Sequence, residues 1–234
     1  MDSLKINVFP ILKEFSGEYA EFCVRPATLP KWLKESSNYA GDPRDKGQLR
    51  HRMTVKKCIQ VFDVFTTGVH LHLPAPMIFE GKYPNRTIDY PPQIPGSKLS
   101  GHDLKQKQKM PIDSDWEDNI YKLEFPYYIQ SPKGYSTLYV PAHPYEDFPL
   151  HFISAIVQTD KYKNSVNFPF FASKSFTGEV DAGTHFMSIF FVKRHDVKIN
   201  YKTYEEGIQE TSVISSMVSN WGKGFYKKLS RDQI

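Results

Sequence analysis

The chain has 234 residues, of which 40% are hydrophobic and 24% are charged. This composition excludes an intrinsically disordered chain, and the length suffices to bury a core without a disulfide or metal cross-link. The 30 basic and 26 acidic residues leave a formal charge of +4, and the basic residues are scattered apart from Lys105, Lys107 and Lys109. Nucleic acid is therefore not expected as a partner.

The N-terminal part of the chain predicts short strands and two helical segments. Strands are expected at residues 4–9 and 19–24, and a helical turn is expected at 28–34, where Trp32 and Leu33 would be its core anchors. A second helix is predicted from Thr54, because Val55, Cys58, Ile59, Phe62 and Phe65 recur at three- and four-residue steps. Gly68 stands where a glycine closes a helix.

Residues 69–73 alternate between apolar residues and histidine, which predicts a strand with His70 and His72 on one face. Two imidazoles on one strand face suit metal ligation, although no third ligand lies nearby in the sequence. The alternative is a solvated or hydrogen-bonded strand face. The sequence therefore names His70 and His72 as a candidate metal site and leaves both interpretations open.

Residues 81–115 contain five prolines and three glycines but no hydrophobic periodicity. We expect a long functional or partner-binding loop there. Beyond it, strand-like segments recur with turns between them, at 121–125, 135–140, 150–158, 166–171 and 185–193. Short strands at this spacing predict a mainly β domain over residues 1–200, an antiparallel β-sandwich or barrel.

Residues 201–234 form a predicted helical tail, because apolar residues there follow a helical stripe that includes Trp221, Phe225 and Leu229. The stripe needs a partner. It packs either on the chain's own sheet or on a neighbouring subunit, which makes these three residues the candidate interface for self-association.

Two turns could present polar groups to a ligand. The first carries Lys133, Gly134 and Ser136, whose amide groups and ammonium could bind an anion. The second turn carries Gln158, Asp160 and Tyr162. Plain connecting turns are the alternative for both.

Three kinds of site are not expected from the sequence: a calcium loop, a nucleotide-cofactor motif and a membrane segment. Asp113, Asp115, Glu117 and Asp118 around Trp116 do not have the spacing of a calcium loop and are expected to be a solvated acidic run. No phosphate-binding or dinucleotide-binding glycine motif is present, so no cofactor is expected. The N-terminus has no apolar targeting segment and no stretch is long enough to cross a membrane, so no membrane partner is expected.

Two cysteines, Cys23 and Cys58, lie in apolar surroundings without metal-ligand spacing. Free, buried thiols are the expected state. A disulfide between them is the alternative that the sequence leaves open.

In four stretches the chain resembles a group of uncharacterised proteins encoded by tailed bacteriophages of marine and cyanobacterial type. The stretches are 30–34, 54–59 with Asp63 and Gly68, 131–138, and 159–194. The resemblance implies a phage origin and a place in the host cytoplasm or the virion. It implies no activity.

Residues 150–194 are also similar to the β-clip fold of trimeric dUTPases and dCTP deaminases. There the two turns correspond to residues 156–162 and 181–188. The resemblance implies a phosphate near Lys133, Gly134 and Ser136 and a base near Tyr162. However, the catalytic carboxylate of that family falls on Gln158, which cannot act as a base, and the glycine-rich C-terminal arm is absent.

Two classes of function follow from the sequence. The first is a non-catalytic structural or interaction protein, either a virion component or a protein that binds a host factor. The second is a nucleotide-binding or nucleotide-processing protein on a dUTPase-like β-clip. A metal-dependent enzyme using His70 and His72 is a third and weaker hypothesis.

Overall fold

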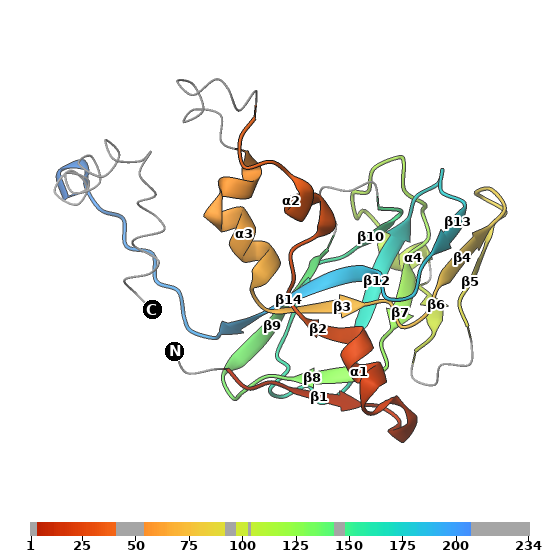
Figure 1. Ribbon diagram of the computed structural model, residues 1–234, viewed down its shortest axis with the longest axis horizontal. Helices are drawn as coiled ribbons and strands as arrows, with labels where there is room; N and C mark the ends of the chain where they lie inside the picture. Colours follow the sequence, from red (N-terminus) through yellow and green to blue (C-terminus); the bar gives the residue numbers. More distant parts are fainter. Residues whose placement is uncertain (1–3, 41–53, 92–96, 103, 143–147, 207–234) are drawn as a thin grey trace. The chain divides into compact units, whose positions relative to one another are not determined.

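The computed structural model describes residues 4–40, 54–91, 97–102, 104–142 and 148–206 (Figure 1). Internal contacts divide the chain into two units. Among the described residues, the β unit comprises those within 4–27 and 68–194, and the helical unit comprises 28–40, 54–67 and 195–206. The sequence-based boundary at residue 200 stays a prediction, because most of the tail lies outside the described residues.

The largest sheet of the β unit has five antiparallel strands in the order β11-β9-β14-β3-β2. Its two longest strands are central neighbours, and seven residues of each pair in an unbroken register. The strands are β11 (Ala155–Val157), β9 (Tyr135–Pro141), β14 (His185–Lys193), β3 (Val69–His72) and β2 (Val24–Pro26).

Three smaller antiparallel sheets complete the β unit (Figure 1). The four-stranded sheet contains β10 (Leu150–Phe152), β12 (Asn167–Ala172), β7 (Tyr121–Glu124) and β6 (Leu99–Gly101). The three-stranded sheet contains β13 (Gly178–Val180), β4 (Met77–Glu80) and β5 (Thr87–Asp89). A two-stranded sheet pairs β1 (Asn7–Pro10) with β8 (Tyr127–Gln130). The helical pieces are η1 (Lys13–Phe15), α1 (Glu18–Cys23) and α4 (Leu104–Lys107).

Aromatic rings from two sheets meet in the core of the β unit. Phe168 of β12 lies 5.3 Å from Phe186 of β14 and 5.4 Å from Tyr139 of β9, measured between ring centroids. Phe152 of β10 lies 4.9 Å from Phe186. All four side chains are buried. The inner faces of the four- and five-stranded sheets therefore pack as in a sandwich, and the predicted mainly β, antiparallel class is confirmed.

Three predictions for the β unit are wrong in detail. Residues 19–24 were expected to be a strand, but residues 19–23 belong to α1 and only Val24 is in a strand, β2. Tyr19, Ala20 and Cys23 have helical spacing and pack on the core. The expected strand at 150–158 is two strands, β10 and β11, which belong to different sheets. The expected loop at 81–115 contains β5, β6 and α4.

The helical unit contains α2 (Lys31–Glu35), η3 (Val55–Lys57) and α3 (Ile59–Thr66). Leu33 is buried, and the ring of Trp32 meets that of buried Phe65 edge to face at 5.7 Å. Trp32 and Leu33 therefore anchor α2 as predicted. Val55 and Phe62 of the expected apolar stripe are exposed.

Both cysteines are free thiols, and Cys23 is fully buried. Burial raises the pKa of the Cys23 thiol to about 12, so this cysteine is a core residue and not a reactive one. No helix in the described part of the chain is long and apolar enough to cross a membrane.

Candidate functional site

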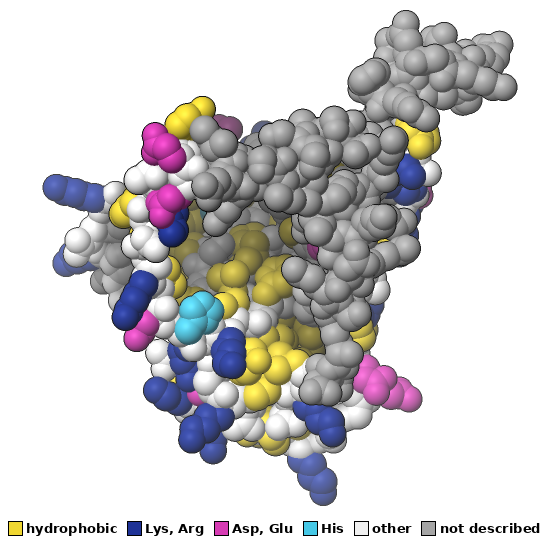
Figure 2. All heavy atoms as spheres, turned by 90° about the vertical axis from the view of Figure 1, so that its left-hand side faces the viewer, with side chains coloured by type: hydrophobic (Ala, Val, Ile, Leu, Met, Phe, Trp, Pro, Cys, Tyr) yellow, Lys and Arg dark blue, Asp and Glu magenta, His cyan; other side chains and the backbone are white. Residues whose placement is uncertain are grey.

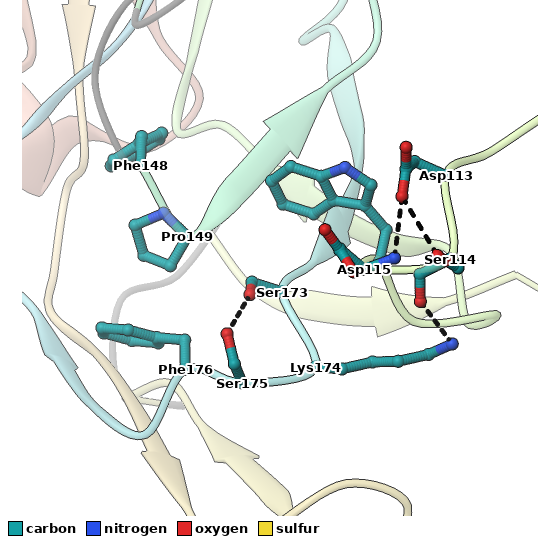
Figure 3. Close-up of a pocket in the computed structure, with 10 residues that line it drawn as sticks. Asp113, Ser114, Asp115, Phe148, Pro149, Ser173, Lys174, Ser175 and Phe176 are labelled. Atoms are coloured by element: carbon teal, nitrogen blue, oxygen red, sulfur yellow. Dashed lines mark hydrogen bonds between the residues drawn. The ribbon is translucent and has the colours of Figure 1, made fainter.

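A pocket of about 660 Å³ opens on the β unit where three chain segments meet (Figure 3). Residues 113–116 precede β7, residues 148–149 precede β10, and residues 173–176 follow β12. We refer to this cavity as the aromatic pocket, because Trp116, Phe148 and Phe176 are among its lining residues.

Backbone hydrogen bonds hold the three segments together. Trp116 and Ser173 form an antiparallel β-bridge, and the Lys174 N–H donates to the Asp115 carbonyl at 2.9 Å. The Ser173 N–H donates to the Pro149 carbonyl, also at 2.9 Å. The walls of the pocket are therefore fixed by main-chain pairing and not only by side-chain packing.

A buried ion pair holds one wall of the pocket through hydrogen bonds to its backbone. The side chains of Arg86 and Glu117 are each 1% exposed, with 2.5 Å between Nη2 and Oε1. The Arg86 guanidinium donates to the carbonyl oxygens of Ser173, at 2.8 Å, and Phe176. Because the guanidinium spans both ends of the 173–176 turn, it determines the shape of that wall.

Tyr121 completes this buried polar cluster. Its hydroxyl donates to Glu117 Oε2 at 2.6 Å. Burial raises the pKa of Tyr121 to about 12, and the neighbouring Glu117 carboxylate contributes to the rise. The expectation that Glu117 belongs to a solvated acidic run is wrong. Its partner Arg86 lies 31 positions earlier in the sequence, so no local pattern signals the pairing.

The aromatic pocket has an apolar side and a polar side (Figure 3). Phe148, Pro149 and Phe176 lie together on one side, and Asp113, Ser114 and Lys174 lie on the other. The hydroxyls of Ser173 and Ser175 are 3.1 Å apart. Such a division of apolar contact and a few placed polar groups is typical of ligand sites.

The polar side offers acceptors next to donors. Asp113 Oδ1 accepts the Asp115 N–H at 3.0 Å, and Lys174 Nζ donates to the Ser114 carbonyl at 2.8 Å. The Asp115 carboxylate has no hydrogen-bond partner among the described residues. It is therefore available to accept bonds from a ligand.

Three of the six residues predicted to bind a ligand, namely Gly134, Ser136 and Asp160, lie together in the structure, where Arg194 joins them. Arg194 donates to both carboxylate oxygens of Asp160, at 2.8 and 2.5 Å, and to Ser136 Oγ at 3.2 Å. The Gly134 N–H donates to Asp160 Oδ2 at 2.9 Å. These bonds from Arg194, and then from Gly134, hold the pKa of Asp160 well below its usual range.

The other three residues of that prediction do not join this cluster. Lys133, Gln158 and Tyr162 are exposed. The Gln158 carbonyl accepts backbone N–H groups from Lys161 and Tyr162, both at 2.9 Å, which is the bonding of a tight turn. The arrangement as a whole is thus a strand-end ion pair with a connecting turn, and the Gly134 N–H, one of the donors expected to bind an anion, already serves Asp160.

His70 and His72 lie in a buried cluster and not on a solvated strand face, because His185 of β14 packs against them. The ring centroids of His70 and His185 are 3.8 Å apart, and those of His72 and His185 are 5.4 Å apart. His185 is the third histidine that the local sequence could not supply. Even so, no group of three or more histidine, cysteine or acidic side chains is placed to hold a metal ion in the described part of the chain.

The remaining predicted site residues, Trp221, Phe225 and Leu229, lie outside the described residues. On the face drawn in Figure 2, lysine and arginine side chains stand among polar and hydrophobic surface without merging into one patch.

No protein-family model matches the chain, and no curated protein matches it either.

Sequence reasoning missed the aromatic pocket because its three segments are far apart in the chain. Trp116 within an acidic run was the one local signal.

Proposed function

We propose that this chain is a non-catalytic recognition protein, phage-encoded as its sequence resemblance implies, whose partner binds in the aromatic pocket. The observation that carries the proposal is the pocket itself, with phenylalanine and proline side chains on one side and polar groups, among them the Asp115 carboxylate, on the other. Sites of this composition bind through shape and a few directed hydrogen bonds.

The polar groups of the pocket are arranged for binding more than for catalysis. A catalytic acid, base or nucleophile must be placed to exchange a proton or attack a substrate. Here Asp113 accepts bonds within its own turn, and the Lys174 ammonium donates to the Ser114 carbonyl. The described lining contains no cysteine or histidine.

The nucleotide-binding alternative draws less support from the geometry. Its phosphate would need the Gly134 amide and nearby basic groups, but that amide and the Arg194 guanidinium are already engaged by Asp160. In the aromatic pocket, phosphate would face the carboxylates of Asp113 and Asp115, and like charges repel.

The proposal is tested by comparing the wild-type protein with two variants. Immobilised protein is exposed to fractionated extract of the host cells, and retained mass is followed by biolayer interferometry. We expect Trp116→Ala to abolish retention. Tyr201→Ala is the matched control, because it removes an aromatic ring that is 88% exposed and lies elsewhere in the chain.

Both variants must keep the wild-type melting temperature within a few degrees, so that loss of retention reports on the pocket. Equal retention by wild type and Trp116→Ala would show that the pocket is not the binding site. Mass spectrometry of purified phage particles then distinguishes a virion component from a protein that acts on host factors inside the cell.

A further inference from the structure

The chemistry of the aromatic pocket narrows the class of its ligand. Trp116 is partly exposed, and its ring lies 5.3 Å from that of His151. An indole presents a flat apolar face together with one polar edge. A ligand that stacks on this platform must itself be flat and apolar on one face.

The other side of the pocket requires hydrogen-bonding capacity of both kinds. The Asp115 carboxylate can only accept, the Lys174 ammonium can only donate, and the Ser173 and Ser175 hydroxyls can do either. All four groups lie in the lining. A ligand with several neighbouring hydroxyls satisfies such a set, because each hydroxyl both donates and accepts.

Charge argues against an anionic ligand, which the carboxylates of Asp113 and Asp115 would repel. The Lys174 ammonium in the same wall, which donates to the Ser114 carbonyl, offsets part of their charge. A neutral, polar ligand therefore suits the pocket better than an anion, and a basic ligand is the rival that the test must separate from it.

We infer that the aromatic pocket binds a neutral carbohydrate, with one sugar ring stacked on Trp116 and its hydroxyls bonded to Asp115 and the Ser173–Ser175 pair. The inference rests on the proposed recognition function and names its ligand class. A volume of about 660 Å³ lies within the range of pockets that hold drug-sized molecules, so a short oligosaccharide suits it better than a monosaccharide.

The test is titration calorimetry with the full chain and a panel of neutral oligosaccharides, namely maltotriose, cellotriose, mannotriose, galactobiose and chitobiose. We expect saturable binding of at least one of them. Trp116→Ala should weaken that binding at least tenfold, and Trp116→Phe should weaken it less because a flat ring remains. Asp115→Asn should weaken it several-fold, since an amide cannot accept at both positions. Tyr201→Ala should leave it unchanged.

The salt dependence of binding distinguishes a neutral sugar from a basic peptide as the ligand. Binding of a neutral sugar should change little between 50 and 500 mM NaCl, whereas binding of a basic hexapeptide, used as the comparison probe, would fall steeply. Saturable, Trp116-dependent binding of the peptide in place of any sugar would overturn the carbohydrate assignment, and so would a panel in which no sugar binds.

Failure of the inference is distinguishable from failure of the proposed function. If no sugar binds but extract components are still retained by wild type and lost with Trp116→Ala, the recognition function stands and the ligand class is wrong. If neither sugar binding nor retention depends on Trp116, both proposals fall.

Discussion

The imidazole rings of His70 on β3 and His185 on β14 stack face to face, with centroids 3.8 Å apart and planes inclined by 15°. Both lie beside His72, and Arg25 of β2 pairs with His70 in the strand register. A buried cluster that already borders a guanidinium has little tolerance for further positive charge. Protonation of this cluster at low pH should therefore destabilise the folded protein.

The first prediction is that stability falls as the pH is lowered from 6.5 to 4. Burial, and then the charges of Arg25 and His70, lower the pKa of His72 from 6.5 to about 4 in the folded protein. In that window the unfolded chain binds the proton and the folded one does not, so the free energy of unfolding decreases by about 1.4 kcal/mol per pH unit. Urea denaturation at pH 7, 5.5 and 4.5 measures it.

His72→Gln removes the titrating group and should flatten this pH dependence. His195→Gln, at an exposed histidine, should leave the slope as in the wild type. Asp160 should not affect this measurement much. Because its pKa is lowered in the folded protein, the stability that it contributes is lost only as the pH falls below the ordinary pKa range of a carboxyl group. A wild-type stability that is equal at pH 7 and 4.5 would contradict the prediction.

The second prediction concerns the ion pair of Arg86 and Glu117. With both side chains 1% exposed, removing one partner leaves a buried charge without compensation. Glu117→Gln and Arg86→Met should each lower the free energy of unfolding by about 3–5 kcal/mol. Denaturant titration measures both single variants.

The double variant Arg86→Met with Glu117→Gln is the informative comparison, because neither charge is then left alone. It should be less destabilised than the sum of the single variants, as expected for two residues in contact. Strict additivity would show that the two charges do not compensate each other in the folded protein.

The third prediction separates a structural role for Arg194 from a ligand-binding one. Arg194→Met breaks the bonds to Asp160, Ser136 and the Tyr135 carbonyl and should lower the melting temperature by several degrees. Lys193→Met changes the adjacent, exposed cation and should have almost no effect. If both variants melt like the wild type and Arg194→Met instead shifts binding of a nucleotide, the ion pair is not structural.

Local patterns predicted what depends on neighbours in the sequence. The strand at 185–193 was predicted with both of its ends, because the aromatic and β-branched residues in this segment favour strands. The helix α1 was missed because Tyr19 to Cys23 contain β-favouring aromatic residues, and packing on the core overrides that preference.

The site depends on contacts that no local pattern encodes. Trp116 meets Ser173 across 57 positions, and Glu117 meets Arg86 across 31. A sequence shows that an acidic residue is present but not that a distant guanidinium makes its burial tolerable. For the same reason Asp160 suggested a ligand site, although its partner is Arg194.

The last prediction uses two glycines that share a backbone conformation but differ in surroundings. Gly68 has φ +85° and Gly134 has φ +88°, so alanine at either site carries the left-handed strain of about 1–2 kcal/mol. At Gly68 an added Cβ would also overlap the carbonyl oxygen of Ile189 on the neighbouring strand, whereas at Gly134 nothing lies within 4 Å of it. A backbone carbonyl in a central strand cannot turn aside as a side chain can. Gly68→Ala should therefore cost about 1–3 kcal/mol more than Gly134→Ala, measured by urea denaturation, and equal losses would show that β3 and β14 approach each other less closely than the structure has them.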